Sequence, residues 1–264
     1  MYKIGVDIGT SITKIICVKK DSFKIVYKLS TKEKDLKKNL EKFIAENNIN
    51  IEKIENITLT GIGALNFDEN IYDIPVKIKD EFLCVAEGAS FVTKNDDILV
   101  VSIGTGTAFI RKNKENIKHM GGTGVGGGTL ENLCKRLANV NSFEEILELA
   151  QKGNLNNIDL KVKDITENQI SNLNLDTTVC NFGKNGKAND EDLVLAVINM
   201  IFETIGVMSA FLLKNDNIKE VITTGTLTTI PLTKEILNHV EELHDIKFII
   251  PENSEYITCI GAVI

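Results

Sequence analysis

The feature that most constrains the fold is a turn rich in glycine and hydroxyl residues between two β-prone segments, which occurs once in each half of the chain. The first turn, residues 7–11, follows the β-prone residues 2–6 and leads back into the apolar run 13–18. The second, residues 104–107, follows the continuous apolar run 98–101 and precedes another short apolar run. Two such turns indicate a duplicated α/β lobe, although their flanks differ too much to be a sequence repeat.

The rest of the chain alternates predicted strands and predicted helices. Leu36, Leu40, Phe43 and Ile44 have the i, i+4, i+7, i+8 spacing of an amphipathic helix. Similar arguments predict helices at 78–92, 130–138, 143–151, 193–213 and 233–243, and strands at 23–29, 57–60, 220–224 and 246–250. The polar run 94–97 suggests a boundary that divides an N-terminal lobe, 1–95, from a C-terminal lobe, 96–264.

Composition narrows the possible partners. The 264 residues are 43% hydrophobic and carry a formal net charge of −7, so we expect a globular protein that does not bind nucleic acid, because such binding needs a basic face. The N-terminal residues lack the pattern of a signal peptide, and no uncharged apolar run reaches the roughly 18 residues of a membrane span. We therefore expect a cytoplasmic protein with no membrane partner. Five well-separated cysteines disfavour a disulfide framework and a zinc site.

The first turn has the chemistry of a phosphate hairpin. Gly9 permits close backbone approach, and the hydroxyls of Thr10 and Ser11 suit phosphate oxygens. Asp7, at the strand end, is a candidate Mg²⁺ ligand, and Lys14 is a candidate cation for a phosphoryl group. The alternative is a solvated hairpin turn in which aspartate and glycine serve only turn geometry.

The second turn and the glycine block after it strengthen the phosphate hypothesis. Gly104, Thr105 and Gly106 repeat the chemistry of the first turn, as a nucleotide cleft between two lobes requires. Residues 121–129 contain six glycines in nine positions and lead into a predicted helix, whose N-terminal amides attract anions. A flexible surface loop is the alternative for this block. It is not a Walker loop, because no Gly-Lys-Ser/Thr ends it.

These motifs, in their order, resemble those of the type II pantothenate kinases. The resemblance runs from residue 3 to about 264 and rests on DIGTSITK, IPVKIKDEF, SIGTGT, GGTGVGGGT, SFEEILELAQKGNLNNIDLKVKDI and CNFGKN. It implies an α/β, two-lobed actin-like (ribonuclease H-like) ATPase fold with a nucleotide cleft between the lobes. It also implies a homodimer that uses ATP and Mg²⁺ to phosphorylate pantothenate to 4′-phosphopantothenate, the first step of coenzyme A biosynthesis.

The resemblance also assigns roles to individual residues. Glu81, just before Phe82, matches the family's general base. Without the resemblance, a solvated helix position is the preferred interpretation of Glu81, since Asp80 and Glu87 are equally available. Asp7 is the implied metal ligand. The implied nucleotide-binding positions are Asp7, Ile8, Gly9, Thr10, Ser11, Ile12, Thr13, Lys14, Gly104, Thr105, Gly106, Gly127, Gly128, Thr129, Leu130, Glu131, Phe143 (packing near the adenine) and Thr226.

One departure from the family pattern concerns the acceptor. The resemblance places His119 and Thr123 on the acceptor side, but the family usually has an arginine where this chain has His119. A shorter side chain without a permanent charge leaves a second hypothesis open, a kinase for a related hydroxylated substrate such as pantetheine. A third hypothesis is an ATP-dependent activator or sensor of the same fold, in which Cys134 would bridge a cluster between subunits.

Overall fold

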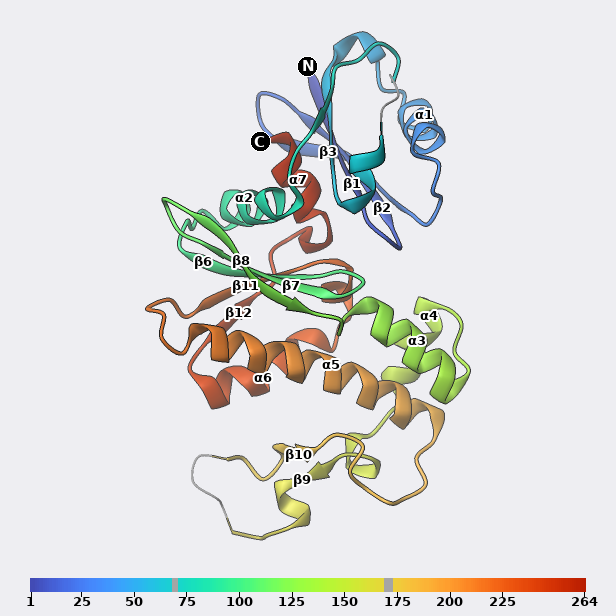
Figure 1. Ribbon diagram of the computed structural model, residues 1–264. Helices are drawn as coiled ribbons and strands as arrows, with labels where there is room; N and C mark the ends of the chain where they lie inside the picture. The colour runs from blue at the N-terminus through green and yellow to red at the C-terminus, as the bar shows by residue number, and fades with distance from the viewer. Residues whose placement is uncertain (68–70, 169–172) are drawn as a thin grey trace.

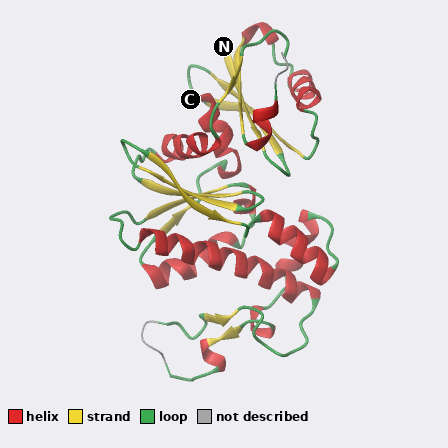
Figure 2. Ribbon diagram, in the orientation of Figure 1, coloured by secondary structure: helices red, strands yellow, loops and turns green. Residues whose placement is uncertain are grey.

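The protein is built on two five-stranded mixed sheets (Figures 1 and 2). The computed structural model describes residues 1–67, 71–168 and 173–264. The first sheet has the order β3-β2-β1-β4-β5, with strands β1 (Tyr2–Ile8), β2 (Thr13–Lys19), β3 (Lys24–Thr31), β4 (Ile54–Thr60) and β5 (Val76–Ile78). The second has the order β12-β11-β6-β7-β8, with strands β6 (Ile98–Ile103), β7 (Thr107–Lys112), β8 (Ile117–Thr123), β11 (Glu220–Thr224) and β12 (Lys247–Ile249).

The two sheets share one topology. In the first, β1, β2 and β3 form an antiparallel meander, while β4 lies parallel to β1 and β5 lies parallel to β4. In the second, β6, β7 and β8 form the meander, β11 lies parallel to β6 and β12 lies parallel to β11. The predicted duplication of an α/β lobe is therefore confirmed, although the two halves differ in sequence.

Two helices lie between the sheets (Figure 1). They are α2 (Glu81–Thr93) and α7 (Ile257–Val263), and they follow β5 and β12, the last strand of each sheet. They cross in backbone contact, because a Cβ added at Gly261 would overlap the carbonyl group of Cys84. Their apolar side chains form one buried cluster with residues of both sheets, so burial of this layer joins the two lobes.

Other helices cover the outer faces of the sheets. Helix α1 (Leu36–Glu46) buries Leu36, Leu40, Phe43 and Ile44 against the first sheet, and the Asp35 carboxylate caps it by accepting from the Lys38 amide at 3.0 Å. The second sheet is covered by α3 (Gly127–Ala138), α4 (Phe143–Ala150), α5 (Asp190–Leu213) and α6 (Thr233–His244). Short 3₁₀ helices span Ile51–Lys53, Ile62–Asn66, Leu155–Asn157, Val162–Asp164, Thr226–Thr229 and Ser254–Tyr256.

Helix α5 is long and apolar enough by composition to cross a membrane, but its surroundings are those of a core helix. Its most apolar 18-residue window is 61% buried inside the protein. It packs against α3, α4 and α6, and its buried residues belong to the core of the second lobe. The prediction of a buried helix at this position is confirmed.

A small flap lies on the far side of α5 from the second sheet (Figure 1). It carries a two-stranded sheet of β9 (Leu160–Lys161) and β10 (Thr178–Cys180). The fully buried carboxylate of Asp159 anchors it by accepting from the Phe182 amide at 2.8 Å and from the Asn199 side chain of α5 at 3.1 Å. The stretches 142–165 and 180–185, which carry part of the family resemblance, thus form α4 and much of this flap.

Three details of the predicted elements were wrong. Residues 78–92 do not form one helix, because β5 ends at Ile78 and α2 begins only at Glu81, after the Asp80 cap. The start of the glycine block is not a loop, because Gly121–Thr123 complete strand β8, and α3 already begins at Gly127. Helix α7 was missed because it is seven residues long and almost wholly buried, so it lacks the periodic polar face of an amphipathic helix.

Candidate active site

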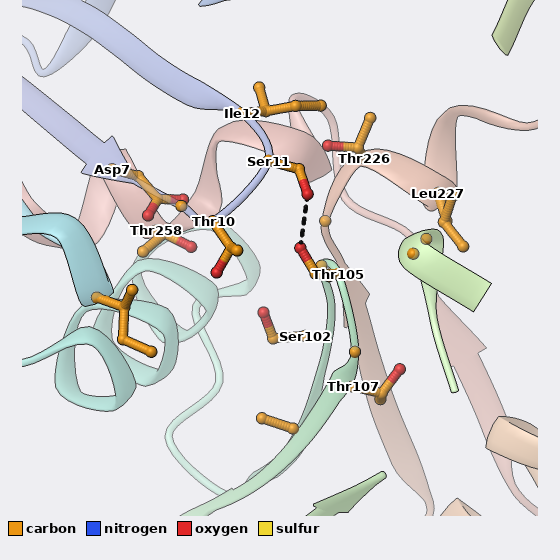
Figure 3. Close-up of a pocket in the computed structure, with 18 of the residues that line it drawn as sticks. Asp7, Thr10, Ser11, Ile12, Ser102, Thr105, Thr107, Thr226, Leu227 and Thr258 are labelled. Carbon is orange, nitrogen blue, oxygen red and sulfur yellow. Dashed lines mark hydrogen bonds between the residues drawn. The ribbon is translucent and has the colours of Figure 1, made fainter. Parts of the chain in front are cut away.

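A cavity of about 740 Å³ lies between the two lobes and is lined by both phosphate-hairpin turns. The two turns touch across it, because the hydroxyl oxygens of Ser11 and Thr105 are 3.1 Å apart (Figure 3). In the view of Figure 3, Asp7 and Thr258 lie on one side of this contact and Thr226 and Leu227 lie on the other. The hairpin tips therefore lie between two chemically different groups of lining residues.

The first hairpin is held in shape by its own backbone. Asp7 and Lys14 are direct partners in the antiparallel register of β1 and β2. The Gly9 amide closes the turn by donating to the Ile12 carbonyl at 3.1 Å, and a Cβ at Gly9 would lie only 2.8 Å from that oxygen. Glycine is therefore needed at position 9 by the turn itself, and the hydroxyls of Thr10 and Ser11 line the cavity.

The second hairpin is tied to the start of α3. Gly104 donates its amide to the Gly106 carbonyl at 2.8 Å within the turn. The Gly127 amide donates to the Gly104 carbonyl at 2.8 Å, and the Gly128 amide donates to the Thr105 carbonyl at 2.9 Å. The expectation that the α3 N-terminal amides serve an anion is thus wrong for these two groups, because the hairpin carbonyls already accept from them.

Close backbone packing explains much of the glycine block. A Cβ at Gly126 would lie 2.8 Å from three backbone atoms of Gly106, and one at Gly122 would lie 2.6 Å from the Thr107 carbonyl oxygen. Thr107 in turn donates its hydroxyl to the Val125 carbonyl at 2.8 Å. The block therefore lets β8, the second hairpin and α3 meet at the cavity wall without side chains between them.

The acidic end of the cavity contains Glu81, Asp7 and Lys14. Burial raises the pKa of Glu81 to about 7, with further upward contributions from Asp7 and Asp80 and a smaller downward one from Lys14. Burial also raises the pKa of Asp7, and the neighbouring Lys14 offsets part of that rise. A carboxyl group that titrates near neutral pH inside a cleft is suited to accept a proton from a hydroxyl.

The opposite end of the cavity contains Phe143, the first residue of α4, together with Thr226. Gly225, just before Thr226, has a φ of 102° and lies so close to Ile103 that a side chain would overlap its carbonyl group. Glu131 of α3 and Lys32, which follows β3, complete this end and approach each other to 3.9 Å. An aromatic ring beside glycine and hydroxyl groups suits a nucleoside.

The structure brings most of the predicted site residues to one cavity. Those that line it are Asp7, Gly9, Thr10, Ser11, Ile12, Lys14, Glu81, Gly104, Thr105, Gly106, His119, Thr123, Gly127, Gly128, Glu131, Phe143 and Thr226. Four others do not line it: Ile8, Thr13, Thr129 and Leu130. Leu130 is fully buried in the core of the second lobe, and the Thr129 hydroxyl instead donates to the Gly124 carbonyl at 2.8 Å.

Several lining residues were not predicted from the sequence. Ser102, Thr107, Gly122, Gly124 and Glu144 lie within the motifs already identified, so each motif as a whole was the signal for them. Ala108, Gly225 and Leu227 lie next to predicted positions but outside the quoted motifs. Lys32, Ile62 and Thr258 carry no local signal, because distant parts of the chain bring them to the cavity.

Comparison with known proteins decides the family. Residues 96–263 match the family model named Fumble. A type II pantothenate kinase of Staphylococcus saprophyticus subsp. saprophyticus is 30% identical over 234 residues, which cover 85% of this chain and 84% of the relative. The chain belongs to the type II pantothenate kinases of the Fumble family. A type II pantothenate kinase of Staphylococcus aureus is 27% identical over 272 residues, which cover 99% of this chain and 98% of that relative.

Solved structures agree with the fold expected for a type II pantothenate kinase. The activator of the 2-hydroxyisocaproyl-CoA dehydratase from Clostridium difficile, with bound ADPNP, superposes with a TM-score of 0.66 at 18% identity, covering 100% of this chain and 93% of that one. A ROK family glucokinase from Streptomyces griseus, in complex with glucose and AMPPNP, superposes with a TM-score of 0.61 at 13% identity. The match covers 100% of this chain and 98% of the glucokinase chain. The predicted two-lobed ATPase fold is confirmed.

Proposed function

We propose that this chain transfers the γ-phosphoryl group of ATP to the primary hydroxyl of pantothenate, the first step of coenzyme A biosynthesis. The observation that carries the proposal is Glu81, a carboxyl group with a raised pKa at one end of a cavity that both phosphate hairpins line. Family membership supports pantothenate as the acceptor. The raised pKa supports proton abstraction, because a base that titrates near the working pH transfers protons efficiently.

In this proposal each end of the cavity has a separate task. Glu81 accepts the proton of the pantothenate hydroxyl as that oxygen attacks the γ-phosphorus and ADP leaves. Hydroxyl and backbone groups of the hairpins around Ser11 and Thr105 hold the phosphates, while Phe143 packs near the adenine. His119 and Thr123, both on β8, face the acceptor.

The residues at the acidic end fit Mg²⁺. The carboxylates of Asp7 and Glu81 line this end, and among the described residues no group of three or more His, Cys, Asp or Glu side chains could hold a metal ion. That donor set is typical of Mg²⁺ sites that are completed by substrate phosphates and water. Asp7 would hold the ion, which when bound would neutralise charge on the phosphates.

An ADP-release assay with ATP, Mg²⁺ and pantothenate tests the proposal. We expect wild-type turnover, a rate that rises with pH through about 7 as Glu81 loses its proton, and a fall of roughly 10²-fold or more in Glu81→Gln. The matched control is Glu87→Gln, on the same helix but paired with Lys79 at 2.6 Å and outside the cavity lining. Wild-type protein that binds ATP but leaves pantothenate unchanged would refute pantothenate as the acceptor.

Pantetheine is the second candidate acceptor. It is favoured by His119, which lines the cavity where the family usually has an arginine, because an imidazole carries no permanent charge for a carboxylate. Comparing kcat/KM for pantothenate and pantetheine separates the two acceptors. The activator hypothesis loses its support, because Cys134 is fully buried in the core of the second lobe and cannot bridge a cluster between subunits.

The proposal includes a cytoplasmic homodimer. A dimer is the assembly that the resemblance to the type II pantothenate kinases implies. Light scattering at micromolar concentration tests the dimer, and a monomer mass would contradict it.

A further inference from the structure

The aromatic pair Phe82–His119 joins the first turn of α2 to strand β8 at the edge of the cavity. The two rings are nearly parallel, with an interplanar angle of 7° and centroids 4.2 Å apart. Phe82 directly follows Glu81 in the chain, and His119 lines the cavity. One stacked contact therefore connects the proposed general base to the acceptor wall.

The two rings have different surroundings. Phe82 does not line the cavity but packs partly buried against the apolar cluster between the sheets. His119 lies on β8, the edge strand of the second sheet, and is exposed apart from this contact. Phe82 is thus the anchored partner, and its ring restricts the rotamers of an imidazole that otherwise faces open space.

The first turn of α2 depends on few other restraints. The Asp80 carboxylate caps it by accepting from the Leu83 amide at 2.8 Å, and Cys84 donates its amide to the Asp80 carbonyl at 3.0 Å. No described hydrogen bond holds the side chain of Glu81 itself. The backbone on either side of Glu81 is therefore held by the cap on one side and by the packed ring of Phe82 on the other.

We propose that Phe82 is a positioning residue that, through its stack with His119, holds the Glu81 carboxylate and the His119 imidazole in fixed relative positions around the acceptor hydroxyl. The inference rests on the proposed kinase reaction. A displacement of about 1 Å in such an arrangement costs up to roughly 10²-fold in rate, so a packed ring next to the base affects turnover without touching the substrate.

The test compares Phe82→Leu, which keeps an apolar side chain but loses the ring plane, with Phe82→Tyr, which keeps the ring. For Phe82→Leu we expect kcat to fall about tenfold and the acceptor KM to rise about tenfold, with the KM for ATP within about twofold of wild type. Phe82→Tyr should recover most of the loss. The matched control is Phe91→Leu, also on α2 and also in an aromatic pair, with Phe23 at 5.5 Å, but away from the cavity.

Two NMR readouts test the stack without turnover. The chain has only three histidines, so the imidazole signals of His119 can be assigned with His119→Gln. In the wild type they should be shifted by the Phe82 ring current, and the shift should be lost in Phe82→Leu but kept in Phe91→Leu. The pKa of the Glu81 carboxyl should also fall in Phe82→Leu alone, because a looser first turn admits water.

The outcomes separate this inference from the proposed function. Wild-type protein without pantothenate turnover would refute the acceptor assignment, while the NMR shifts would still decide the stack. The positioning role would be overturned if Phe82→Leu had the same kinetic constants as Phe91→Leu. It would also be overturned if the NMR signals of His119 and Glu81 in Phe82→Leu were the same as in the wild type.

Discussion

At the scale of single residues, the ionisation of Glu81 affects both proton transfer in the proposed reaction and the stability of the folded protein. The carboxyl group has a pKa of about 7 in the folded protein against an ordinary value of 4.5, because burial and the neighbouring carboxylates disfavour its charged form. Between these two values the folded state holds the proton more tightly than the unfolded state does. This group therefore makes the protein less stable as the pH rises from about 4.5 to about 7.

We predict that Glu81→Gln stabilises the ligand-free protein at pH 8 and leaves its stability nearly unchanged at pH 4. At pH 8 the wild type must hold a buried charge that glutamine lacks, which costs on the order of 1–3 kcal/mol given the size of the pKa shift. At pH 4 the carboxyl group is protonated in the folded state and largely protonated in the unfolded state, so little difference remains. Urea unfolding at both pH values measures the difference, and equal midpoints for the two proteins at pH 8 would contradict the buried charge.

At the scale of elements, the glycine block is a packing device at the junction of β8, the second hairpin and α3. Its amides donate to hairpin carbonyls at 2.8 and 2.9 Å, and its missing side chains allow backbone to meet backbone. A sequence with six glycines in nine positions is equally consistent with a flexible loop. The contacts of Gly122, Gly126, Gly127 and Gly128 favour a rigid junction instead.

We predict that Gly126→Ala destabilises the protein by about 1–3 kcal/mol and weakens ATP binding, because the new Cβ would lie 2.8 Å from the backbone of Gly106 and displace the second hairpin. The stability control is Gly124→Ala in the same block, where a Cβ would meet nothing within 4 Å. Thermal unfolding and nucleotide titration measure both effects. If the two variants lose the same stability, close packing is not the reason for glycine at position 126.

At the scale of the whole molecule, the lobes are joined by the α2–α7 layer and meet again across the cavity. The Ser11–Thr105 contact joins the hairpin tips, and the ammonium of Lys32 in the first lobe lies 3.9 Å from the Glu131 carboxylate in the second. Both charged side chains are largely exposed, so their attraction is modest and is screened by salt.

We predict that Lys32→Glu and Glu131→Lys each weaken ATP binding up to about fivefold at low salt, because like charges then face each other across the cavity mouth. The double variant Lys32→Glu/Glu131→Lys should recover most of the lost ATP affinity. High salt should reduce the effects of both single variants and of the double variant. The control exchanges Lys38 and Glu33, which pair at 3.3 Å within the first lobe. If the loss of ATP-binding free energy in the double variant equals the sum of the losses in the two single variants, the pair does not act across the cleft.

Local sequence patterns were sufficient to predict the fold class and the motifs of the site. Both hairpins, the glycine block and the amphipathic helices are local patterns, so turn chemistry and hydrophobic periodicity were enough to identify them. The family resemblance added Glu81, which composition alone did not separate from Asp80 or Glu87. These features were predictable because each depends on residues within a few positions of one another.

Features that depend on contacts between distant segments became visible in the folded structure. It placed α7, from the end of the chain, against α2 and β1, and it brought Lys32 and Thr258 to the cavity. In the structure Thr129 and Leu130 do not line the cavity. The Thr129 hydroxyl makes a local hydrogen bond, and the Leu130 side chain is buried in the core. The raised pKa of Glu81 and the Phe82–His119 stack also depend on contacts between distant segments, because burial and ring contacts arise only when both lobes have packed.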